Sequence, residues 1–86
     1  MSYALGANVM TQEAGATLVL LDTAQGQYFE LNETGRIWLQ ALISAQSEAQ
    51  ALEAVCDEFE VDPATAAADC GDIKAALQEA GLLLIS

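Results

Sequence analysis

The chain contains no histidine, so the side chain that most often acts as general acid or base in enzymes is missing. A carboxylate could replace it only if burial or a close like charge raised its pKa, and nothing in the spacing demands that. The only cysteines are Cys56 and Cys70, which without histidine cannot form a four-ligand zinc site or a Cys/His catalytic pair. We expect two free core thiols, no catalytic activity, no metal and no cofactor.

Basic residues are almost as scarce. Arg36 and Lys74 stand against 13 acidic residues, which gives a net charge of -11. Because nucleic acids and anionic membranes are bound largely through Lys and Arg, we expect neither as a partner. The chain also lacks an apolar run long enough to span a bilayer, and Met1–Met10 lacks the features of a signal peptide. These absences predict a cytoplasmic protein.

Linkers and internal repeats are missing too, which favours a single domain over residues 1–86 with a core at about residues 7–85. Hydrophobic residues make up 53% of the chain, but 17 residues are alanine. The larger apolar side chains suffice for one thin two-layer core and not for a deep, walled active site.

The first third of the chain has the pattern of a β-sheet. Ala16–Asp22 is apolar and partly β-branched, and Gln27–Leu31 alternates, so the two predict a hairpin. Gly26 would supply the positive φ that closes the loop. A weaker strand is predicted over Ala7–Gln12.

The remainder predicts three helices, each with a start signal. Asn32 can cap the first helix, Ser47 begins an S-x-x-Q capping box for a second that ends near Glu58, and Asp62 precedes Pro63 at the start of a third. Gly81 is the predicted stop of the third helix.

Leu82–Ile85 is too short for a helix and is either a final strand or an apolar clasp. The order of elements predicts an α+β, winged helix-turn-helix-like fold, with a three-stranded antiparallel sheet followed by three helices.

Two alternative sites can be weighed from the residues. The acidic cluster at residues 57–62 lacks the alternating pattern and glutamate of a calcium-binding EF-hand loop, so it favours a solvated corner. A carrier protein needs an exposed serine, usually within D-S-L, at the start of a helix. Ser47 starts a helix within A-Q-S-E instead, and a hairpin is foreign to an all-helical carrier.

The edge of the sheet offers a binding site of another kind. Phe29 and Leu31 should lie on one face of their strand, with Tyr28 and Glu30 on the other. Tyr28 is either a half-exposed strand residue or part of a binding edge, because an edge strand can hydrogen-bond to an extended peptide. The third helix would form one wall of a groove there, and its acidic residues would prefer a basic peptide.

Two segments resemble a known family. They are G-Q-Y-F-E-L-N-E-T-G-R-I-W, Gly26–Trp38, and D-C-G-D-I-K-A-A-L-Q-E-A-G-L-L, Asp69–Leu83. The chain resembles the PqqD-like recognition elements for precursors of ribosomally synthesised and modified peptides. Within that family it is most similar to the free-standing leader-binding proteins of lasso-peptide biosynthesis.

The resemblance implies a peptide chaperone without catalytic activity, which binds the leader of a precursor peptide as an added strand and delivers it to a cysteine-protease-like leader peptidase. The implied leader-binding residues are Gln27, Tyr28, Phe29, Glu30, Leu31, Asp69, Asp72, Ile73 and Ala76. The main alternative is a PqqD-type chaperone for a radical-SAM modifying enzyme. A winged-helix DNA-binding regulator and a carrier protein are more remote alternatives.

Overall fold

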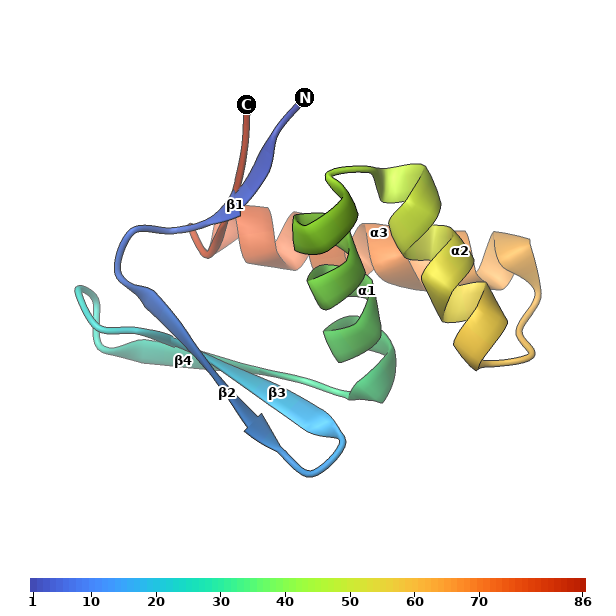
Figure 1. Ribbon diagram of the computed structural model, residues 1–86. Coiled ribbons are helices and arrows are strands. Elements are labelled where there is room, and N and C mark those ends of the chain that lie inside the picture. The colour runs from blue at the N-terminus through green and yellow to red at the C-terminus, as the bar shows by residue number, and fades with distance from the viewer.

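The computed structural model describes residues 1–86, and its central sheet and three helices confirm the predicted fold class. The sheet is antiparallel, in the order β2-β3-β4. Its strands are β2 (Val9–Ala14), β3 (Thr17–Asp22) and β4 (Gln27–Leu31). The helices are α1 (Glu33–Ala45), α2 (Glu48–Glu58) and α3 (Pro63–Glu79). Figure 1 shows the sheet and the helices as two parts joined through α1.

The β3–β4 hairpin forms as predicted. Gly26 has φ +68°, and its N–H donates to the Asp22 carbonyl at 2.9 Å. The Asp22 carboxylate is buried and accepts the next two turn N–H groups, from Ala24 and Gln25. This local network explains why a short polar sequence between two apolar segments forms a tight turn.

The strand predicted over residues 7–12 is displaced, because β2 starts at Val9 and continues to Ala14. Asn8 belongs to a turn instead. Its carbonyl accepts the backbone N–H and the hydroxyl of Thr23, at 3.0 and 3.1 Å, just past the end of the neighbouring strand β3.

All three predicted helix caps are present. The side chains of Asn32, Ser47 and Asp62 accept the backbone N–H three residues further on, at 2.9, 3.2 and 3.2 Å. These bonds satisfy donors that the first helical turn leaves free. No helix is long and apolar enough to cross a membrane.

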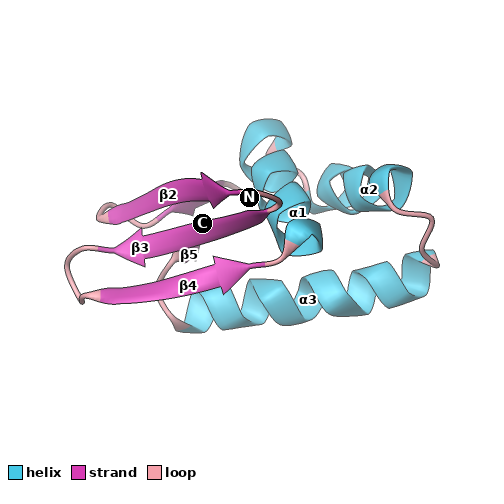
Figure 2. Ribbon diagram, turned by 90° about the horizontal axis from the view of Figure 1, so that it is seen from below, coloured by secondary structure: helices cyan, strands magenta, loops and turns pink.

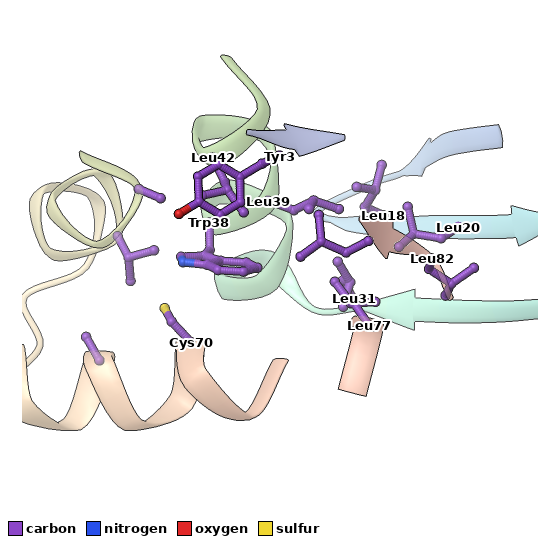
Figure 3. Close-up of a cluster of buried hydrophobic side chains, with 14 residues drawn as sticks. Tyr3, Leu18, Leu20, Leu31, Trp38, Leu39, Leu42, Cys70, Leu77 and Leu82 are labelled. Atoms are coloured by element: carbon purple, nitrogen blue, oxygen red, sulfur yellow. The ribbon is translucent and has the colours of Figure 1, made fainter. Parts of the chain in front are cut away.

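The core lies between the inner face of the sheet and the helices. Leu18, Leu20 and Leu31 point inward from the strands and meet Leu77 and Leu82 (Figure 3). The remaining core residues extend toward α2 and include Trp38, Leu39, Leu42, Val55 and Cys70.

Both cysteines are free, as expected. Cys70 is buried in the core, and Cys56 is partly exposed. Burial raises the pKa of the Cys70 thiol, and the nearby negative charge of Asp69 adds to the effect.

A second sheet joins the two ends of the chain and was not predicted in full. β1 (Tyr3–Leu5) pairs antiparallel with β5 (Leu83–Ile85), so the C-terminal segment is a strand with a partner from the N-terminus. Gln46 fastens β1 to the end of α1. Its side-chain amide accepts the Tyr3 N–H at 2.7 Å and donates to the Tyr3 carbonyl at 2.8 Å.

Tyr3 also links β1 to two helices. Its hydroxyl donates to Glu48 of α2 at 2.7 Å, and Lys74 of α3 lies 2.9 Å from the same carboxylate. The hydrogen bonds from Tyr3 and Lys74 lower the pKa of Glu48, while the bond to Glu48 raises the pKa of Tyr3.

Candidate peptide-binding groove

β4 forms one edge of the three-stranded sheet and pairs with β3 on one side only. Alternate residues of such a strand direct their N–H and C=O groups away from the sheet. The side chains alternate as well. Phe29 and Leu31 point toward the core, and Tyr28 and Glu30 point to the outer face. The edge can therefore form a new β-ladder with an extended chain.

A groove lies between this edge and α3. Figure 2 shows α3 running alongside β4. Two adjoining hollows share Asn32 and Ile73. The first is also lined by Thr17, Phe29, Glu30 and Leu31, and the second by Thr34, Asp69 and Asp72. The groove thus has an apolar half at β4 and an acidic half at α3.

Gly35 allows α1 to lie close to the floor of this groove. A Cβ at this position would stand 3.1 Å from the Leu31 Cβ and 3.4 Å from the Ile73 Cδ1. The first distance is shorter than a comfortable carbon contact, and the second is at the close limit of ordinary contact. The absent side chain therefore lets β4, α1 and α3 meet at one point.

The acidic half of the groove has no neutralising partner in the protein. Lys74 is paired with Glu48, at 2.9 Å. Arg36 donates to the Ala16 carbonyl at 2.9 Å and lies 3.8 Å from Glu13. Both basic side chains are thus engaged elsewhere, and the field in the groove favours a cationic ligand.

A family model, "Coenzyme PQQ synthesis protein D (PqqD)", matches residues 17–83, which include both walls of the groove. The chain belongs to the PqqD family. The match begins at β3 and ends at the first residue of β5, so β1 and β2 lie outside it.

Two solved structures are similar over nearly the whole length of this PqqD-family protein. One is described as "Lasso peptide synthetase B1 complexed with the leader peptide", with a TM-score of 0.88 and 27% identity, covering 99% of this chain and 100% of the other. The other is "TbiB1 in Complex with the TbiA(beta) Leader Peptide", with a TM-score of 0.83 and 28% identity, covering 96% and 94%. No curated protein matches by sequence.

Six of the nine residues named from the sequence line the groove of this PqqD-family protein. They are Phe29, Glu30, Leu31, Asp69, Asp72 and Ile73. Asn32, Thr34 and Thr17 line it too and were missed, Asn32 because it was considered only as the cap of α1.

The other three residues are placed differently. Gln27 uses its side chain to tie β4 to the end of α3, since its Nε2 donates to the Ala80 carbonyl at 3.1 Å. Tyr28 is 70% exposed on the outer face of the sheet, away from the groove. Ala76 is half-buried on α3 and lines neither hollow.

Proposed function

We propose that this protein binds the leader segment of a ribosomally synthesised precursor peptide and has no catalytic activity of its own. The observation that carries the proposal is the unpaired β4 edge beside the α3 groove, in a fold shared with two proteins whose structures are described as leader-peptide complexes. The leader would add a strand to the sheet next to β4.

Each part of the groove has a role in this proposal. The backbone of residues 27–31 pairs with the leader and supplies affinity that depends little on sequence. Phe29 and Ile73 receive an apolar leader side chain. Asp69 and Asp72 favour a basic residue at the open end of the groove, while Ala76 contributes only to the shape of the helix wall.

The bound leader is then delivered to a leader peptidase in lasso-peptide maturation. Binding both proteins to one precursor raises the effective concentration of the scissile region at the peptidase without new chemistry. A single added strand buries a modest area, so we expect a Kd between about 1 nM and 1 μM.

The test is fluorescence anisotropy with the labelled leader of a candidate lasso-peptide precursor from the same genome, and with a scrambled leader as control. Saturable binding of the natural leader alone is expected. The leader is also synthesised with single N-methyl groups along its backbone. Because strand pairing uses alternate N–H groups, affinity should fall at every second position of the paired segment. Equal losses at adjacent positions would contradict strand addition.

The acidic wall is tested with the double variant Asp69→Asn/Asp72→Asn. If the leader places cations there, affinity should fall about 2- to 30-fold, from about 0.2–1 kcal/mol for each exposed ion pair. Glu53→Gln/Asp57→Asn removes the same charge from α2, outside the groove, and is the matched control. Equal losses in the two variants would indicate that only net charge matters.

The alternative partner is a radical-SAM modifying enzyme, and the family description, which names coenzyme PQQ synthesis, favours including it. The two candidate partners are distinguished by adding the leader peptidase or the radical-SAM enzyme, each separately, to the leader-bound protein. A ternary complex with the peptidase supports the lasso assignment, and one with an iron-sulfur enzyme contradicts it.

A further inference from the structure

The outer face of the sheet carries a row of exposed apolar side chains. Met10, Leu21 and Tyr28 are direct cross-strand neighbours, because Met10 pairs with Leu21 and Leu21 pairs with Tyr28. They are 62%, 42% and 70% exposed. We call these three residues the outer row. The sheet face that carries it is turned away from the core, which packs on the other face.

The outer row is not part of the core of the isolated fold. The side chains that stabilise the sheet, Leu18, Leu20 and Leu31, all point to the opposite face. Side chains directly opposite in an antiparallel pair lie about 5 Å apart, so three large apolar groups make one continuous strip. Exposed strips of this kind on small proteins often mark contacts with other proteins.

Charge indicates the kind of protein that would cover the strip. Strand alternation places one charged residue on this face, Glu30, beside Tyr28, and no basic residue. A second copy of the chain would bring another net charge of -11 against the first, which opposes self-association. The complementary surface is an apolar patch bordered by Lys or Arg.

The position of the row connects it to the proposed groove. Tyr28 is the end of the row that lies on the β4 edge, where an added strand would pair. Every second side chain of that strand would point to the outer face, and one of them would lie next to Tyr28. A bound leader would thus lengthen the row by one side chain.

We propose that the outer row is the docking surface for the enzyme that processes the bound precursor, and that this enzyme recognises the row together with the leader side chain that extends it. This rests on the proposed function. The enzyme would then bind the leader-loaded protein more tightly than the free protein, so that the empty protein competes weakly for it.

The experiment separates leader binding from enzyme docking. Met10→Ser/Leu21→Ser removes apolar surface outside the groove, and Val61→Ser, at a residue that is 40% exposed after α2, is the matched control. Circular dichroism first checks that each variant is folded. Leader affinity, measured by anisotropy, should stay within about twofold of the parent protein for both.

Docking is measured by biolayer interferometry with a purified leader peptidase of lasso-peptide biosynthesis, with and without the leader. We expect at least tenfold tighter binding in the presence of the leader, and at least a tenfold loss in Met10→Ser/Leu21→Ser but not in Val61→Ser. Unchanged docking by the double variant would overturn the proposal, as would a dimer in sedimentation that the double variant dissociates. If the parent protein fails to bind the leader, the proposed function itself fails.

Discussion

Replacing Gly35 with alanine adds one methyl group at the point where α1 meets the groove. The new Cβ would lie 3.1 and 3.3 Å from the Leu31 Cβ and Cδ2, and 3.4 Å from the Ile73 Cδ1. The Leu31 Cβ is fixed to the β4 backbone and cannot turn aside. Overpacking of this kind costs about 1–3 kcal/mol, and the better helix propensity of alanine returns about 1 kcal/mol. We expect a net loss of about 0–2 kcal/mol.

Gly71→Ala is the matched control, because it makes the same change inside α3 where no atom lies within 4 Å of the new Cβ. It should stabilise the protein by about 0.5–1 kcal/mol. The two variants should therefore differ by about 1–3 kcal/mol, or by at least roughly 4 °C in Tm. Urea unfolding followed by the fluorescence of Trp38, the single buried tryptophan, measures the difference. Equal stabilisation by both substitutions would refute the close approach of Gly35 to Leu31. The affinity for the leader should fall in Gly35→Ala and stay unchanged in Gly71→Ala.

Glu48→Gln tests the link between Tyr3 and Lys74. Folding lowers the pKa of Glu48. The ionised carboxylate therefore stabilises the folded protein above the ordinary glutamate pKa, and this stabilisation is lost as the pH falls through the pKa of Glu48 in the folded protein. Between pH 7 and 3, thermal melts of the parent and Glu48→Gln should converge toward the acid end, and a constant difference would contradict the coupling. Gln46 has φ 56°, so Gln46→Gly should relieve about 1 kcal/mol of left-handed strain that Gln46→Ala retains, while both lose the two bonds to β1, at about 1 kcal/mol each. Hydrogen exchange should show faster exchange of the Tyr3 amide in both variants, and an unchanged rate would mean that β5 alone holds β1. Alkylation at pH 8 followed by mass spectrometry should label Cys56 well before Cys70, because Cys70 is buried and its pKa is raised; equal rates would contradict this.

The features that could be predicted from the sequence are those determined by neighbouring residues. A cap joins a side chain to a backbone group three positions away, so Asn32, Ser47 and Asp62 indicated the three helix starts. The β3–β4 hairpin has the same local origin, because Gly26 and Asp22 form the turn within their own segment.

Features that depend on distant residues were harder to predict. β1 has three residues and its partner β5 also has three, which is too short for a periodic signal, and the pairing joins opposite ends of the chain. The strand before the hairpin begins at Val9 and not at Ala7, because Ala7 and Asn8 form a turn closed by a hydrogen bond from the Val9 N–H to the Gly6 carbonyl, at 3.0 Å.

In the candidate site, too, the local feature, strand alternation, was predictable, and the long-range feature, the placement of α3 against the sheet, was not. Strand alternation placed Phe29 and Tyr28 on opposite faces, and the structure has them there. Which α3 residues face the groove depends on the rotation of that helix against the sheet. Asp69, Asp72, Ile73 and Ala76 share one face at helical spacing, and Ala76 lies outside the two hollows because it is about one turn farther along α3 than Ile73.

The pairing of β1 with β5 has a practical consequence for engineering. Ser2 and Ser86 exchange two backbone hydrogen bonds, so the first and last residues emerge together, on the opposite side of the molecule from the β2–β3 turn (Figure 1). A short linker could join them into a circular permutant, with new ends opened at the exposed Thr23–Gly26 turn. A tag or an enzyme fused at either original end would start from the same point, so the choice of end should hardly change its reach toward a peptide held in the groove.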